Sequence, residues 1–112
     1  MVEFHPELAV EFAAMVEVVQ DELLAHVRLL SEFGPTLGRP AVDTLKGSKI
    51  ANLKELRFAA DAGVWRVAFA FDGNRVAVLL AAGDKSGKRG GAETRFYKAL
   101  IALAERRWTG WV

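Results

Sequence analysis

Two arginines interrupt stretches whose remaining residues are typical of buried strands. Arg57 lies in Leu-Lys-Glu-Leu-Arg-Phe, and Arg66 lies in Trp-Arg-Val-Ala-Phe-Ala-Phe. A guanidinium is costly inside a strand unless it has a partner or faces solvent. One explanation is structural: Arg66 pairs with Glu55 across a hairpin. Likewise, Arg57 could pair with Asp61. The other explanation is an anion site, because the arginine fork can hold a phosphate through two hydrogen bonds.

A basic loop follows the strand-like residues, Gly-Asp-Lys-Ser-Gly-Lys-Arg-Gly-Gly from Gly83 onward. A nucleotide-binding phosphate loop has four residues between its glycines and a Ser or Thr after the lysine. Here three residues separate the glycines and Arg89 follows Lys88, so we expect neither ATP nor GTP as cofactor. A flexible loop with Lys85, Lys88 and Arg89 could still meet a phosphate backbone, or could be a solvated connection.

Other site chemistries find little support. The chain has no cysteine, and its two histidines, His5 and His26, lack the spacing of metal ligands. Neither histidine lies near the basic region in sequence, so no Ser/His/Asp set is indicated. The acidic residues are scattered rather than paired, which disfavours a two-carboxylate hydrolase. We therefore predict neither a metal nor a cofactor.

The periodicity predicts the elements that must position these residues. Apolar residues recur at spacings of three and four over 6–33, which indicates either one long helix or a helical hairpin that turns near Glu17–Asp21. A connection rich in Gly and Pro follows over 32–49. Three strands are predicted next, with Asp72–Gly73 as a hairpin turn, and a last helix follows. Their predicted bounds are Leu53–Phe58, Trp65–Phe71 and Arg75–Ala82 for the strands, and Ala92–Arg107 for the helix.

Length, composition and charge describe a single domain over residues 1–112. The 112 residues are 52% hydrophobic and 26% charged, which is typical of one globular domain. The order of the predicted elements indicates the α+β class, with helices on one face of an antiparallel sheet. The absence of cysteine, of a signal peptide and of a membrane-length apolar run predicts a cytoplasmic protein. The net charge is +1, but residues 1–33 carry −6 and residues 34–112 carry +7. This asymmetry favours a basic face, although a solvated surface would explain it equally well.

Several short motifs, in this order, resemble one family. They begin with Phe-His-Pro-Glu at Phe4–Glu7 and Leu-Lys-Gly at Leu45–Gly47. The strand motifs follow at Leu53–Phe58, Trp65–Val67 and Leu79–Lys85, and Arg-Phe-Tyr-Lys at Arg95–Lys98 closes the series. Together they are similar to the phage Gp49-like branch of the HigB/RelE toxins, within the RelE/ParE superfamily of type II toxin–antitoxin systems.

The resemblance implies a RelE-like fold: an N-terminal helical hairpin on a small antiparallel sheet of three to four strands, with a C-terminal helix. It also implies a first strand at Val2–Phe4. The helical turn would fall at Met15–Val16, where relatives often carry a proline that this chain lacks.

The activity implied by the resemblance is metal-independent cleavage of messenger RNA, usually on the ribosome, restrained by a helix-turn-helix antitoxin. The attacking group would be the ribose 2′-OH. The catalytic candidates are Arg57, Arg66, Lys85 and Tyr97. The RNA-binding candidates are Lys46, Lys54, Lys88 and Arg89.

Strand alternation complicates one assignment, because Lys54 and Arg57 face opposite sides of a regular strand. No residue is an obvious general base, and this leaves two other functions open. The protein could inhibit DNA gyrase without catalysis, as ParE-like relatives do. It could also be a degenerate toxin that only binds an antitoxin.

Overall fold

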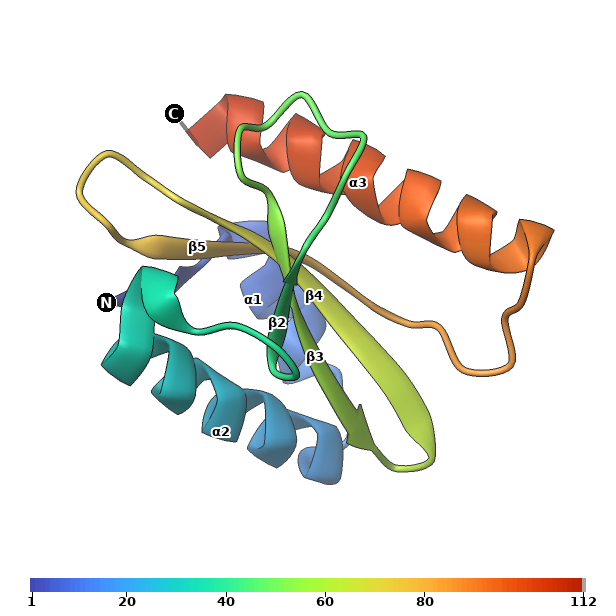
Figure 1. Cartoon of the computed structure of the whole chain (residues 1–112). Coiled ribbons are helices and arrows are strands. Elements are labelled where there is room, and N and C mark those ends of the chain that lie inside the picture. Colours follow the sequence, from blue (N-terminus) through green and yellow to red (C-terminus); the bar gives the residue numbers. More distant parts are fainter. Residues whose placement is uncertain (112) are drawn as a thin grey trace.

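A five-stranded mixed sheet forms the middle layer of the protein (Figure 1), here a computed structural model that describes residues 1–111. The strand order is β1-β5-β4-β3-β2. β1 is parallel to β5, and every other neighbouring pair is antiparallel. The strand bounds are β1 (Val2–Phe4), β2 (Val42–Thr44), β3 (Lys54–Ala60), β4 (Gly63–Phe71) and β5 (Ala77–Asp84).

The three predicted strands are confirmed as β3, β4 and β5, with shifted ends. Asp72 closes the β4–β5 turn, because its Oδ1 accepts the backbone N–H groups of Asn74 and Val76 at 2.8 and 2.9 Å. Arg75 has a φ of 62°, a left-handed conformation that a strand cannot contain. β5 therefore begins at Ala77, two residues after the predicted start.

The sheet departs from the prediction of three to four antiparallel strands. β1 occurs where the family resemblance placed it, but it pairs parallel to β5. β2 lies within the connection that was predicted to be irregular, and pairs with the start of β3. Each of these strands has three residues, too few for an alternating apolar pattern to be recognised, and β2 also lies among glycines and prolines.

The N-terminal helical region is two helices, α1 (Pro6–Ala13) and α2 (Glu17–Phe33), followed by the 3₁₀ turn η1 (Gly34–Thr36). His5 caps α1, with Nδ1 accepting the Glu7 N–H at 3.1 Å. The chain turns at residues 14–16, the position that the family resemblance indicated. The alternative turn near Glu17–Asp21 is wrong, because those residues form the first turns of α2.

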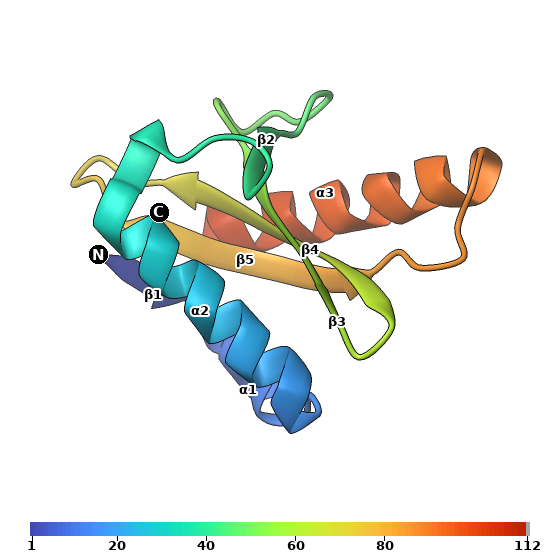
Figure 2. The same ribbon diagram turned by 60° about the horizontal axis from the view of Figure 1, so that its bottom comes forward.

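Helices cover both faces of the sheet (Figure 2), which corrects the prediction of helices on one face. α1 and α2 pack on one face, against side chains such as Leu56, Phe69 and Leu79. α3 (Gly91–Trp111) packs on the other, where Leu100 and Ala104 join a second core. Strands β4 and β5 are apolar on both sides, so a single helical layer would leave one apolar face in water.

Arg107 ties three elements together from the C-terminal half of α3. The residue is 4% exposed, and its guanidinium donates to both carboxylate oxygens of Glu11 in α1, at 3.1 and 2.6 Å. It also donates to the carbonyl oxygen of Leu80 in β5 at 2.7 Å. A buried charge requires such partners, and here they fix α3 across the sheet from α1. Among residues 1–111, none of the helices combines the length and apolarity needed to cross a bilayer.

Candidate functional site

Arg57 and Arg66 stand directly opposite each other on β3 and β4. Alternation along the strands turns both side chains toward α3, together with Glu55 two residues before Arg57. Two like charges in this cross-strand position repel each other. The arrangement therefore requires an anion between or beside them.

Glu55 supplies that negative charge. Its Oε1 lies 3.7 Å from Arg66 Nε, and its Oε2 lies 3.9 Å from Arg57 Nε. The residue is only 5% exposed. Burial, which penalises the charged form, raises the pKa of Glu55 above its ordinary value despite hydrogen bonding from Tyr97 and the two nearby guanidiniums. A buried carboxylate with a raised pKa is a common feature of sites that transfer protons.

Tyr97, in the second turn of α3, connects this charge cluster to the helix. Its hydroxyl donates to Glu55 Oε1 at 3.0 Å and accepts from Arg66 Nε at 3.3 Å. Burial is the main reason why the pKa of Tyr97 is raised above 10.0. Arg66 also donates to the carbonyl oxygen of Trp65 at 2.9 Å. Arg66, Tyr97 and Glu55 thus form one hydrogen-bonded network beneath α3.

A pocket of about 380 Å³ opens above this network. Arg57 and Lys85 are among its cations, and Lys85 Nζ lies 5.5 Å from the centre of the Tyr97 ring. Lys85 Nζ also contacts the Glu93 carboxylate at 2.6 Å, which lowers the pKa of Glu93. The pocket is lined by Asp43, Thr44, Leu45, Lys46, Glu55, Arg57, Lys85, Glu93, Tyr97 and Ile101. We call it the anion pocket.

Arg57 is incompletely satisfied within this pocket. Its NH1 lies 3.7 Å from the Asp43 carboxylate, a distance too long for a hydrogen bond. Its Nε is buried and has no hydrogen-bond partner among residues 1–111. Buried donors are usually paired, whereas the Arg57 side chain as a whole is 33% exposed, so the outer part of its guanidinium can donate to the oxygen atoms of a ligand.

The loop between β2 and β3 brings Lys46 to the pocket, and α3 holds that loop (Figure 1). Glu105 accepts hydrogen bonds from Ser48 Oγ at 2.9 Å and from the Lys49 N–H at 2.6 Å. These bonds lower the pKa of Glu105. A second hollow of about 510 Å³ shares Lys46, Glu93, Tyr97 and Ile101 with the anion pocket and adds Lys98. Because the two hollows share four lining residues, we treat them as one surface along α3, the basic groove, whose four cations outnumber its three carboxylates.

Comparison with known proteins places this chain in a family. Residues 10–109 match the model of the phage-derived Gp49-like proteins. The chain belongs to the Gp49-like family. This confirms the resemblance on which the sequence-based expectations rest.

Two relatives of this Gp49-like chain come from Mycobacterium tuberculosis. One, named "Putative toxin HigB3", is 37% identical over 107 residues, which span 96% of this chain and 89% of the relative. The other, named "Putative toxin HigB2", is 46% identical over 84 residues, which span 74% of this chain but 40% of the relative. No solved structure matches the chain.

In this Gp49-like protein, four of the eight predicted site residues line the anion pocket: Lys46, Arg57, Lys85 and Tyr97. Arg66 lies beneath the pocket rather than in its lining, because it is 7% exposed and bound to Tyr97 and Glu55. Its predicted ion pair with Glu55 is present. The alternative partner for Arg57, Asp61, is not used, since the acids near its guanidinium are Asp43 and Glu55.

The remaining three predicted residues lie elsewhere. Lys54 is opposite Phe69 on β4 and, by alternation, shares the α2 face of the sheet. Lys88 lies against the Phe96 ring at 5.9 Å, in a different groove, and Arg89 is exposed in the loop before α3. Lys85, Lys88 and Arg89 are close together in sequence, but they lie in the anion pocket, in a second groove and in an exposed loop, respectively.

Four charged residues of the groove were not among the predicted site residues: Asp43, Glu55, Glu93 and Lys98. Only Glu55 had a detectable signal, because it shares strand parity with Arg57 and was already the expected partner of Arg66. The others depend on β2 and α3 meeting across the sheet.

Both histidines have structural positions. His5 caps α1, and His26 packs on Phe58 with ring centres 5.2 Å apart, on the α2 side of the sheet. Within the described residues 1–111, no group of three or more His, Cys, Asp or Glu side chains is placed to hold a metal ion.

Proposed function

We propose that this protein is the toxin of a type II toxin–antitoxin system and that it cleaves messenger RNA in the cytoplasm, on the ribosome. The observation that carries the proposal is Arg57, whose buried Nε lacks a hydrogen-bond partner in a pocket that also holds Lys46, Lys85 and Tyr97. Membership of the Gp49-like family and the names of two relatives support the toxin assignment.

The reaction suited to these residues needs no protein nucleophile. The ribose 2′-oxygen attacks the adjacent phosphorus while its proton leaves to a base. The bond from phosphorus to the 5′-oxygen then breaks, and that oxygen takes up a proton. The products are a 2′,3′-cyclic phosphate and a 5′-hydroxyl end. The protein must orient the backbone, stabilise the extra negative charge on phosphorus and move two protons.

We assign these tasks according to burial and contact. Arg57, the partly exposed arginine, contacts the phosphate, with Lys85 beside it. Glu55 accepts the 2′-hydroxyl proton, directly or through the hydroxyl of Tyr97, because burial already favours its protonated form. Arg66 is a positioning residue that holds Glu55 and Tyr97 in place. Lys46 and Lys98 bind the RNA backbone along α3.

Two partly exposed carboxylates lie in this basic groove when no RNA is bound. Glu93 pairs with Lys85 at 2.6 Å, and Asp43 lies 3.7 Å from Arg57. Their side chains are 41% and 28% exposed, so each can rotate into water when a phosphate takes its place. Lys85 and Arg57 then exchange one anionic partner for another, which limits the desolvation cost of binding.

The test is induction in bacteria followed by mapping of transcript 5′ ends. We expect growth arrest with codon-phased cuts inside translated messages. Arg57→Ala should abolish both the arrest and the cuts in a protein that remains folded. The matched control is Arg28→Ala, which removes an exposed cation from α2 on the far side of the sheet. If Arg57→Ala stays fully toxic, the site assignment is wrong.

The same experiment distinguishes the alternative function. Intact transcripts together with supercoiling defects would show that the protein inhibits gyrase and is not a ribonuclease. A protein that binds its antitoxin but never arrests growth would be a degenerate toxin. The cognate antitoxin is the partner that the proposal requires, and we expect a small adjacent gene to encode a helix-turn-helix protein.

A further inference from the structure

The outer edge of β5 is only half covered. β1 pairs with Ala77–Leu79 and then ends, and the guanidinium of Arg107 occupies the next carbonyl oxygen, that of Leu80. Within residues 1–111, no strand pairs with the rest of β5 on that side. An unpaired strand edge is a template for another extended chain.

The ladder between β4 and β5 shows which backbone groups this edge offers. Lys85 N–H donates to the Val64 carbonyl at 2.8 Å, which makes that pair a hydrogen-bonded one. Pairing alternates along an antiparallel ladder. Ala82 and Asp84, opposite Val67 and Trp65, therefore direct their backbone N–H and C=O groups away from β4. Those groups point toward the open edge, where the exposed Lys88 Nζ lies 3.4 Å from the Asp84 carbonyl oxygen and would have to move aside for a pairing strand.

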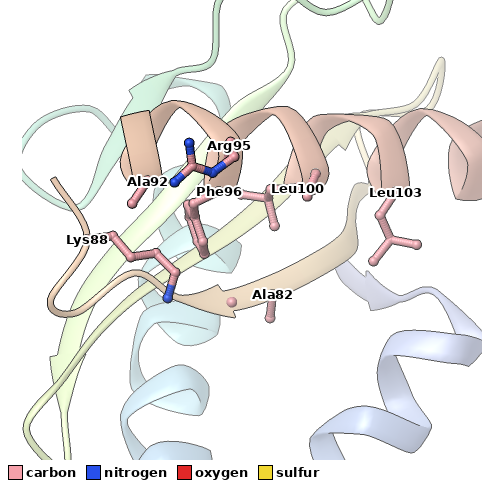
Figure 3. A pocket seen from close by; sticks show the side chains of 9 residues that line it. Ala82, Lys88, Ala92, Arg95, Phe96, Leu100 and Leu103 are labelled. Carbon is pink, nitrogen blue, oxygen red and sulfur yellow. The ribbon is translucent and has the colours of Figure 1, made fainter. Parts of the chain in front are cut away.

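A groove of about 500 Å³ lies between this edge and α3 (Figure 3). Phe96 and Leu100 project from α3 toward β5, and Ala82 forms part of the floor. Phe96 can lie this close because its partner is Gly83: a Cβ on Gly83 would lie 2.8 Å from Phe96 Cε1. The lining is Ala82, Gly83, Lys88, Ala92, Arg95, Phe96, Ala99, Leu100 and Leu103.

The groove's charge specifies what it can accept. Its only charged lining residues are Lys88 and Arg95, both exposed cations near the N-terminal end of α3. No carboxylate lines it. An occupant with acidic side chains at that end and apolar side chains along Phe96 and Leu100 would match both features.

We infer that the β5 edge and this groove bind an extended segment of a partner protein that adds a strand to β5. Its groove-facing side chains, every second residue, are apolar over most of the segment and acidic at one end. Main-chain hydrogen bonds to Ala82 and Asp84 provide the pairing, and the groove receives alternate side chains. A nucleic acid fits less well, because most of the lining is apolar and the backbone groups of the edge suit another peptide.

This inference does not depend on RNA cleavage, because the groove and the anion pocket share no lining residue. The experiment is a nuclear magnetic resonance titration of the ¹⁵N-labelled whole protein with a short capped peptide. Every second residue of this peptide, the set that faces the groove, is valine toward one end and glutamate toward the other, and the residues between them are threonine. We expect shifts and slowed hydrogen exchange at the Ala82 and Asp84 amides. A peptide with lysine for glutamate should bind at least about tenfold more weakly.

Variants separate this surface from the rest of the molecule. Lys88→Glu combined with Arg95→Glu should lower the affinity for the acidic peptide by about tenfold or more. The control Arg106→Glu changes an exposed cation of α3 outside the groove and should leave binding unchanged, as should Arg57→Ala.

Three outcomes would overturn the inference. The first is peptide-induced shifts that map to the anion pocket instead of Ala82 and Asp84. The second is a short RNA that protects these two amides when the peptide does not. The third is protection that grows with protein concentration in the absence of peptide, which would make a second copy of the chain the occupant.

Discussion

Arg57 and Arg66 face each other across β3 and β4, and Glu55 contacts both. Two arginines in direct cross-strand register destabilise a sheet unless an anion offsets them. The buried Glu55 carboxylate offsets the two positive charges, and its burial raises its pKa. The anion pocket leaves the outer side of Arg57 available, so the same cluster combines a proton acceptor with a cation for phosphate.

Replacing Glu55 by Gln should lower the rate of RNA cleavage by about 10²- to 10⁴-fold, the usual contribution of a general base. The wild-type rate should fall as pH decreases through the raised pKa of Glu55, because only the carboxylate accepts a proton. The variant should lack this acidic limb. Single-turnover cleavage measured as a function of pH is the test, and an unchanged limb in the variant would remove Glu55 from the mechanism.

The same substitution should increase stability at neutral pH. Since the folded-state pKa of Glu55 lies above its ordinary value of 4.5, the folded protein holds this proton more tightly than the unfolded chain. The associated stability is present below pH 4.5 and is lost as pH rises through the folded-state pKa. Gln never ionises, and the raised pKa means that the burial cost of the Glu55 carboxylate exceeds its attraction to the two guanidiniums, so Glu55→Gln should be more stable than the wild type at neutral pH. Urea denaturation at neutral and acidic pH measures this, and the gain should disappear in acid.

Tyr97→Phe removes the hydroxyl that joins Arg66 to Glu55 and keeps the ring under Lys85. The hydrogen bond from Tyr97 lowers the pKa of Glu55, so its loss should move the acidic limb of the cleavage profile to higher pH. Stability should decrease by about 1 kcal/mol. A lower rate with no displacement of the limb would show that the hydroxyl acts independently of Glu55.

Glu93→Gln should strengthen RNA binding, because it frees Lys85 from its carboxylate partner. The slope of log affinity against log salt concentration should change little, because Lys85 meets the phosphate backbone in both proteins. Fluorescence anisotropy with labelled RNA across a salt series measures both quantities. A matched control is Glu32→Gln, which removes an exposed carboxylate from α2.

Arg107→Ala should destabilise the fold by roughly 1.5–3 kcal/mol, because the Leu80 carbonyl oxygen loses its donor and the half-exposed Glu11 carboxylate loses its partner. Arg106→Ala, one residue earlier and exposed, should change stability by less than about 0.5 kcal/mol. Chemical denaturation of both variants separates the two cases. Equal losses would mean that the buried network of Arg107 contributes no more to stability than an exposed arginine of α3 does.

Periodicity in the sequence was sufficient for the long elements. The apolar stripes predicted α3 and the helical N-terminal region. Alternation predicted β4, and short strand-like runs, one of them apolar on both faces, predicted β3 and β5. Alternation also predicted that Lys54 and Arg57 face opposite sides, as they do. These results depend on contacts within one element, where side-chain direction follows from backbone geometry.

Only the tertiary structure decided the composition of the site. α3 packs on the face of the sheet opposite α1 and α2, and thereby places Tyr97 over Glu55 and Glu93 beside Lys85. β2, too short for a periodic signal, brings Asp43 and Lys46 to the same pocket. The sequence determined that arginines stand in strands; the packing of α3 decided that Arg57 lines a pocket, that Arg66 lies buried, and that Glu55 has a raised pKa. Burial and proximity between distant residues are properties of the folded chain, so no local pattern in the sequence encodes them.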